Sequence, residues 1–62
     1  MKIEKNKVYT VKKYDLTNDS EINYGAMNGV DVKAIIGTAK YDSEYGMFFT
    51  PKATIGYSIE EI

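Results

Sequence analysis

Four side chains that carry oxygen atoms occur at every second position between residues 15 and 21. They are Asp15, Thr17, Asp19 and Glu21. This alternation is typical of loops that bind Ca²⁺, but such a loop also needs Gly at its sixth position and Glu at its twelfth. Those positions hold Ser20 and Ala26. We therefore interpret the segment as a solvated acidic turn, and we expect neither a metal site nor a cofactor.

The chain lacks the side chains on which many catalytic sites depend. It contains no His and no Cys, which excludes a histidine base, a cysteine nucleophile and a zinc site built from these ligands. It also has no Gly-rich phosphate loop, dinucleotide fingerprint or nucleophile elbow. A chain of 62 residues can hardly enclose the dry concave pocket that catalysis requires. We expect that the protein is not an enzyme.

Acidic residues and two tyrosines of the middle of the chain are the candidate partner-binding residues. They are Asp15, Asp19, Glu21, Tyr24, Asp31, Asp42, Glu44 and Tyr45. Their carboxylates would imitate nucleic-acid phosphates and attract a basic groove on another protein. Tyrosine suits such a surface because its ring is large, rigid and amphipathic. Tyr45, expected at the tip of a turn, is the best candidate for an exposed anchor, and packing back over the sheet is its alternative.

These features predict a small protein-binding module. The chain is rich in Lys, Ile, Asn and Tyr, a composition typical of AT-rich genes, and short cysteine-free proteins of this kind are common in phages and mobile elements. Such a protein would occlude a host nuclease or polymerase, as anti-CRISPR and anti-restriction inhibitors do. The expected partner is therefore a host protein, for example one that processes nucleic acid. The expected compartment is the cytoplasm, because no segment resembles a membrane span or a signal peptide.

A Lys-rich beginning of the chain supports an alternative function, direct binding of nucleic acid by a small β-barrel. Most of the Lys residues fall within positions 1–13, beside Tyr9 and Tyr14. Small barrels bind nucleic acid by combining positive charge with stacking of bases on aromatic rings. However, the chain has no Arg and a net charge of −1, whereas a nucleic-acid-binding domain is normally basic. We therefore favour pairing of these Lys residues with the acidic segment, or protection of an edge strand.

The order of apolar and polar residues predicts an all-β fold in a single domain of residues 1–62. Alternation at every second position predicts four or five antiparallel strands, arranged as a small sheet or a partly open barrel. The richness in Val, Ile and aromatic residues agrees with a sheet. The expected strands cover residues 7–14, 21–27, 30–41, 47–50 and 52–62. Residues 19–28 would alternatively form a short helix, which would make the fold α+β.

Glycine and polar residues predict the turns between these strands. Asn28-Gly29 is the strongest hairpin signal in the chain, and it predicts a type I′ turn with positive φ at Gly29. Gly37 predicts a bulge or a bend within the long third strand. Residues 42–46 predict another turn, in which Gly46 adopts positive φ.

The predicted core combines residues from several of the expected strands. Its members are Val8 or Tyr9, Val11, Val32, Ala34, Ile36, Phe48, Ile55, Tyr57 and Ile59. A domain of this size without disulfides or metal has only marginal stability on its own. We therefore expect the chain to self-associate, most readily as a homodimer in which strand 52–62 pairs with its copy or two sheet faces come into contact.

Overall fold

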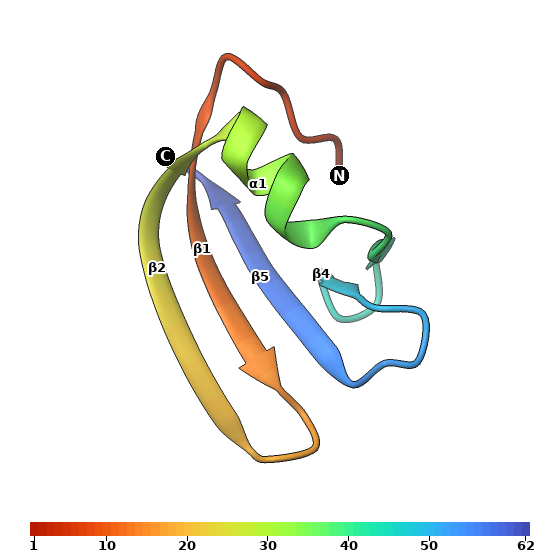
Figure 1. Ribbon diagram of the computed structural model, residues 1–62. Helices are drawn as coiled ribbons and strands as arrows, with labels where there is room; N and C mark the ends of the chain where they lie inside the picture. The colour runs from red at the N-terminus through yellow and green to blue at the C-terminus, as the bar shows by residue number, and fades with distance from the viewer.

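A computed structural model of residues 1–62 shows one open sheet of five antiparallel strands and one short helix (Figure 1). The strands are β1 (Val8–Asp15), β2 (Ser20–Asn28), β3 (Lys40–Asp42), β4 (Met47–Phe49) and β5 (Ile55–Glu61), and the helix is α1 (Gly29–Ile36). Their order across the sheet is β2-β1-β5-β4-β3. The predicted antiparallel sheet of four or five strands is confirmed, and residues 20–28 form the favoured strand rather than a helix.

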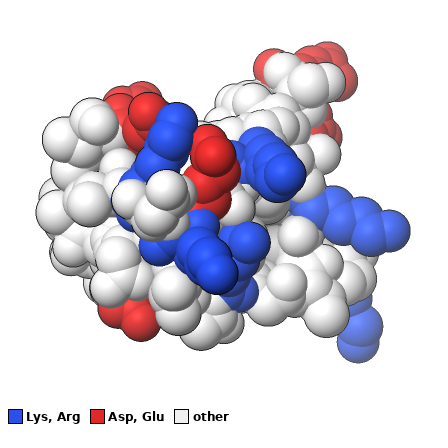
Figure 2. Space-filling view, turned by 90° about the horizontal axis from the view of Figure 1, so that it is seen from above, with Lys and Arg blue, Asp and Glu red and all other residues white.

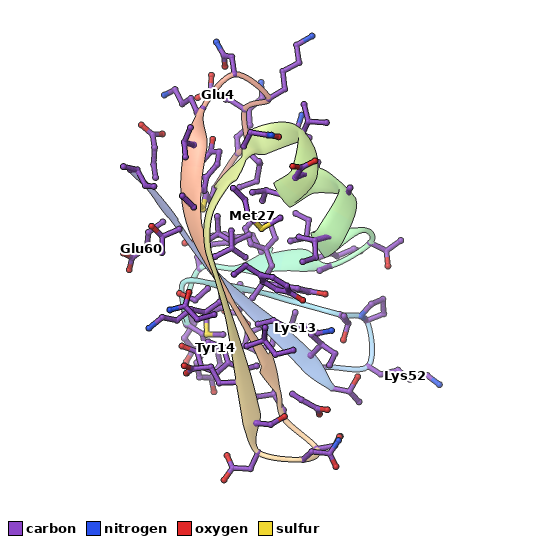
Figure 3. All side chains as sticks on the ribbon, turned by 60° about the vertical axis from the view of Figure 1, so that its left-hand side comes forward. Glu4, Lys13, Tyr14, Met27, Lys52 and Glu60 are labelled. Atoms are coloured by element: carbon purple, nitrogen blue, oxygen red, sulfur yellow. The ribbon has the colours of Figure 1, made fainter.

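The helix covers one face of the sheet and leaves the other face open. Alternate residues of a strand point to opposite faces, so β1 sends Lys13 to the side of the helix and Tyr14 to the other side (Figure 3). Met27 lies on the same side as the helix, where it packs against the core, and Glu60 lies opposite. We call these two sides the helix face and the outer face.

The core lies between α1, the helix face and the segment that precedes β1. It comprises Ile3, Tyr9, Val11, Val32, Phe48, Tyr57 and Ile59. Cross-strand pairing brings these side chains together, as where Val11 of β1 stands opposite Ile59 of β5. The hydroxyl of Tyr9 accepts a hydrogen bond of 2.8 Å from the backbone N–H of Glu4, which ties the first residues of the chain to the sheet.

Most of the predicted core residues are buried, and the exceptions have physical causes. Of the alternatives Val8 and Tyr9, it is Tyr9 that is buried, while Val8 points to the outer face and is exposed. Ile36 and Ile55 are half-buried and pack against the core. Ile3 is buried although it precedes the first strand, because its segment folds back along the helix face rather than extending the sheet.

The predicted strand over residues 30–41 is wrong, because its first part forms α1 and only its last residues form part of β3. Asn28 begins the helix: its Oδ1 accepts a hydrogen bond of 2.9 Å from the backbone N–H of Asp31. Gly37, with a φ of 55°, ends the helix instead of bending a strand.

The alternation in this segment is also compatible with a helix, which explains the error. Val32 and Ile36 are four residues apart, so they share a side of a helix as well as a face of a strand. Ala34 distinguishes the two structures, because it would share that face in a strand but is exposed in α1. The predicted burial of Ala34 is therefore wrong. The capping residues Asn28 and Gly37 indicate a helix, whereas the alternation does not distinguish a helix from a strand.

Gly29 has a different role from the predicted one. The type I′ turn is wrong, since Asn28 caps a helix and Gly29 is not among the residues with positive φ. Instead, α1 begins in close contact with the N-terminal segment, and a Cβ atom at Gly29 would overlap the backbone carbonyl of Glu4. The N–H of Gly29 donates a hydrogen bond of 2.8 Å to the carbonyl of Lys7. The prediction for Gly46 is confirmed, with a φ of 68°.

The strand β5 lies inside the sheet and not at its edge. It pairs with β1 along its whole length and with β4 near its beginning. Pairing of strand 52–62 with its copy is therefore wrong, whereas a homodimer formed by contact between two sheet faces stays a prediction. The edges of the sheet are β2 and the three-residue β3. No helix of the structure has the length and apolar character needed to cross a membrane.

Candidate partner-binding site

An open groove lies where β3, β4 and the turns at one end of the sheet meet. It is the one pocket of the molecule, with a volume of about 1110 Å³. Six of its 11 lining residues are hydrophobic: Leu16, Tyr41, Tyr45, Met47, Phe49 and Ala53. The groove therefore presents mainly apolar side chains to solvent.

The floor of the groove depends on a glycine in β5. Phe49 and Gly56 stand opposite each other in the β4–β5 pair. Because the adjacent Phe48 points to the core, Phe49 points to the outer face. A Cβ atom at Gly56 would lie only 3.0 Å from Met47 Cε and 3.1 Å from Phe49 Cε1. The missing side chain thus leaves room for Met47 and Phe49 to extend over β5.

The turn between β3 and β4 holds Tyr45 at one side of the groove. Asp42 organises this turn, because its Oδ1 accepts hydrogen bonds from the backbone N–H groups of Glu44 at 2.9 Å and Tyr45 at 3.3 Å. Gly46 completes the turn by donating its N–H to the Asp42 carbonyl at 2.8 Å. Tyr45 is 70% exposed, yet its ring meets that of Phe49 edge to face with 5.7 Å between centroids. Tyr45 therefore packs on the sheet and remains accessible to a partner.

The turn between β1 and β2 holds Leu16 at the other side. Leu16 is 50% exposed, and its backbone N–H donates to the carbonyl of Thr54 at 2.9 Å, which joins this turn to the one before β5. The Asp15 carboxylate closes the turn by accepting hydrogen bonds from the side chains of Asn18 and Thr17, both at 2.8 Å, and from their backbone N–H groups. These hydrogen bonds lower the pKa of Asp15 to about 2, and the bond from the Asn18 side chain has the largest effect, followed by that from the Thr17 side chain. Asp15 is thus a turn-forming carboxylate that stays ionised at neutral pH.

Most of the predicted partner-binding residues lie on the two turns that border the groove. The β3–β4 turn carries Asp42, Glu44 and Tyr45, and the β1–β2 turn and its flanks carry Asp15, Asp19 and Glu21. Asp42 and Tyr45 line the groove itself. None of these carboxylates pairs with a Lys, because the ion pairs of the structure are those of Lys7. The two turns therefore carry carboxylates that belong to no ion pair, while the groove between them is lined by one acid, Asp42, and one base, Lys40.

Tyr24 and Asp31 lie elsewhere in the structure. Tyr24 is 38% exposed and is the unpaired residue of a β-bulge in β2. Asp31 belongs to the first turn of α1, where its Oδ2 accepts a hydrogen bond of 3.2 Å from the Asn28 side chain. That end of α1 lies opposite the β1–β2 turn along the molecule (Figure 1). Asp31 thus stabilises the start of the helix rather than a surface shared with the other acids.

Sequence reasoning missed the apolar part of the groove. Leu16 is a large apolar residue within an otherwise polar turn, and this contrast was an available signal. The alternation that places Phe48 in the core also places Phe49 on the opposite face, so its position was predictable once β4 was recognised. The contribution of Ala53 was not predictable, because it depends on the contact between two turns that are distant in the sequence.

Positive charge lies mainly away from the groove. Figure 2 views the molecule from the end that carries residues 1–7, and Lys side chains gather on that face. Lys7 pairs there with Glu4 at 3.1 Å and with Glu61 at 3.3 Å. Its hydrogen bonds to these carboxylates raise its pKa above the usual value, and the bond to Glu4 has the larger effect. Lys40 is the one cationic residue that lines the groove.

The features that would bind nucleic acid do not share one surface. Lys13 points to the helix face, and its neighbour Lys12 therefore points to the outer face (Figure 3). Tyr9 is only 1% exposed, so no base can stack on its ring. Tyr14 shares the outer face with Lys12 only, and it lies apart from the Lys residues that precede β1. This arrangement lends no support to the nucleic-acid alternative.

No three acidic side chains of the structure gather closely enough to hold a metal ion. A comparison with models of protein families, with curated proteins and with solved structures gave no match. A function for the chain is therefore inferred from its own groove, turns and charges.

Proposed function

We propose that the protein is a small, non-enzymatic binding module whose site is the groove together with the β1–β2 and β3–β4 turns, here named the groove surface. The observation that supports this proposal is the gathering of accessible apolar side chains in one place. Leu16 and Tyr45 are largely exposed, and Met47 and Phe49 between them are only half-buried. An apolar patch rimmed by polar residues favours association, because covering it removes apolar surface from water.

The charge of the groove surface favours a partner protein with a basic surface. Asp42 lines the groove and Glu44 belongs to the same turn, while Asp15 and Asp19 belong to the β1–β2 turn, from which Leu16 reaches the groove. Opposite charges steer the encounter of two proteins and suppress association with partners of like charge. A nucleic acid, whose phosphates are negative, is therefore a poor ligand for this surface.

We propose further that the partner is a host enzyme that processes nucleic acid, and that the protein occludes it as a phage or mobile-element inhibitor would. The carboxylates of the two turns would take the place of phosphates in the basic groove of the enzyme. Tyr45 would supply the buried aromatic anchor on which tight protein interfaces depend. Occlusion requires only a stoichiometric complex, so it needs no catalytic residue in this chain.

A capture experiment with a matched pair of variants tests the proposal. The variants are used to capture proteins from a lysate of the cells in which the protein occurs. Tyr45→Ser removes the exposed ring at the groove, and Tyr24→Ser removes an exposed tyrosine from β2 as the control. We expect Tyr45→Ser to lose the captured protein and Tyr24→Ser to keep it, with capture by the wild type weakening as salt rises. Equal capture by the two variants would contradict the proposal.

A gel shift with single-stranded and double-stranded nucleic acids at low salt separates protein binding from direct nucleic-acid binding. We expect no shift, because the groove surface is acidic. A shift that weakens steeply with salt and disappears in Lys12→Ser would favour the nucleic-acid alternative instead.

A further inference from the structure

The groove is open to solvent and does not enclose its contents. Its lining comes from the β3–β4 hairpin, the β1–β2 turn and the turn before β5, so it extends across the end of the sheet from Leu16 to Tyr45. Small ligands favour pockets that bury most of their surface, whereas an open groove of this kind suits a stretch of polypeptide.

Neither edge of the sheet is suited to receive a further strand. β3 has only three residues. β2 is longer, but Tyr24 bulges out of its register, and the adjacent Gly25 has a φ of 73° and donates its N–H to the Asn23 side chain at 2.9 Å. Bulges of this kind interrupt an edge and discourage pairing. A partner segment is therefore recognised by side chains in the groove rather than by addition to the sheet.

The β3–β4 turn determines which charge the segment should carry. Oδ1 of Asp42 is occupied by the turn, whereas Oδ2 takes no part in those hydrogen bonds. Glu44 is exposed and belongs to no ion pair. Glu44 directly precedes the exposed Tyr45 in the chain, and Asp42 lies three residues before it in the same turn. This combination suits arginine, because a guanidinium group pairs with carboxylates and stacks on aromatic rings.

We propose that the groove binds an extended segment of a partner protein in which a large apolar side chain neighbours an arginine. The apolar side chain lies over Met47 and Phe49, between Leu16 and Tyr45. The guanidinium group contacts the Tyr45 ring and the Glu44 carboxylate. The inference rests on the proposed function and adds the chemistry by which the groove surface recognises its partner.

A titration of the isotope-labelled protein with synthetic heptapeptides, followed by amide NMR shifts, tests this chemistry. The probe is Gly-Ser-Arg-Leu-Arg-Ser-Gly, blocked at both ends. In one control peptide Ser replaces Leu, and in the other Glu replaces both Arg. We expect shifts confined to residues 16–17 and 44–50, with a dissociation constant on the order of 1 mM for so short and flexible a ligand. Each control peptide should bind at least about tenfold more weakly, since it lacks one of the two required contacts.

Two pairs of variants locate the contacts of the probe. Glu44→Gln should weaken its binding about threefold through the loss of a charge-assisted contact, and Glu60→Gln, at an exposed position of β5 outside the groove surface, should not. Tyr45→Ser should weaken its binding about tenfold through the loss of apolar and cation–π contact, and Tyr24→Ser should not. None of these four residues caps a turn with its side chain, so we expect all of the variants to fold.

Three results would overturn the inference: no shift at about 5 mM probe, shifts centred on β2 or α1, or equal binding of the Glu-containing peptide. Shifts in the groove caused by a single-stranded oligonucleotide instead of the peptide would also overturn it. If the peptide does not bind but capture of the partner depends on Tyr45, the ligand chemistry is refuted and the proposed function stands. If the peptide binds but Tyr45→Ser does not change the capture, the proposed function is refuted.

Discussion

Phe48 and Phe49 are neighbours in β4, yet they belong to two different regions of the molecule. Phe48 points to the helix face, is buried, and packs against Tyr41 with 5.2 Å between ring centroids. Phe49 points to the outer face and meets the exposed Tyr45. The difference lies in what covers each face, because α1 and the N-terminal segment exclude water from the helix face and no element covers the outer face. The helix face therefore stabilises the fold, and the apolar residues of the outer face remain available to a partner.

The largest loss of stability is expected where the cover of the helix face is most tightly packed. Gly29→Ala should unfold the domain, because even a methyl group would overlap the carbonyl of Glu4. Such overpacking costs about 3 kcal/mol or more, which approaches the whole stability of a small domain. Thermal unfolding followed by circular dichroism measures the effect.

Gly37→Ala is the control for this substitution, because a Cβ atom there meets nothing within 4 Å and only the positive φ opposes it. With a φ of 55° and a ψ of −118°, Gly37 lies outside the left-handed helical region, and we expect Ala there to cost about 1–3 kcal/mol, less than at Gly29. Equal losses in the two variants would mean that α1 does not pack on the N-terminal segment as described.

A loss of comparable size is expected from cavities in the core beneath the helix. Ile59→Ala should cost about 2–5 kcal/mol, because Ile59 is a buried core residue. Ile55→Ala should cost roughly half as much, since the half-buried Ile55 lies at the margin of the core. Unfolding in urea compares the two variants. A greater loss of stability in Ile55→Ala than in Ile59→Ala would show that the centre of the core lies near Ile55 and not near Ile59.

The β1–β2 turn of the groove surface should respond to acid. Folding lowers the pKa of Asp15 from 3.8 to about 2, so the folded state favours the charged carboxylate. The corresponding stability is present above pH 3.8 and is lost as the pH falls through about 2. Asp15→Asn should therefore be less stable than the wild type at neutral pH, and this difference should shrink across that window. Urea unfolding at several pH values measures the difference, and one that is unchanged by acid would contradict the role of Asp15.

The smallest loss of stability is expected on the outer face. Tyr45→Ser should change the free energy of unfolding by less than about 1 kcal/mol, because the side chain is mostly solvent-exposed. The same variant should lose partner capture. A large destabilisation would show that Tyr45 serves the fold, and the contrast between the two faces would then fail.

The main part of the sheet could be predicted from the sequence, because its signals are local. Alternation identified β1, β2 and β5 to within a few residues. Alternation failed at α1, since Val32 and Ile36 fit both a strand and a helix, and the pair Asn28-Gly29 suits both a hairpin turn and a helix start. The position of β5 inside the sheet was also beyond the sequence, because pairing between distant strands leaves no local signal.

The candidate site was likewise predictable only where it depends on residues that are close in the sequence. The acidic turns and Tyr45 were predictable, because a turn depends on neighbouring residues such as Asp42 and Gly46. The groove was not, because it forms only where Leu16 of one turn meets the turn before β5, far along the chain. Sequence reasoning therefore identified the charged border of the site and missed its apolar interior.

Site-specific photo-crosslinking in living cells tests most directly whether the groove surface binds a partner. p-Benzoylphenylalanine is placed in turn at Tyr45 in the groove, at Tyr24 on β2 and at Val30, an exposed apolar residue of α1. We predict an adduct with one discrete host protein from the Tyr45 position and none from the other two. Adducts from the Tyr24 or Val30 position without one from the Tyr45 position would contradict the assignment of the groove surface as the binding site.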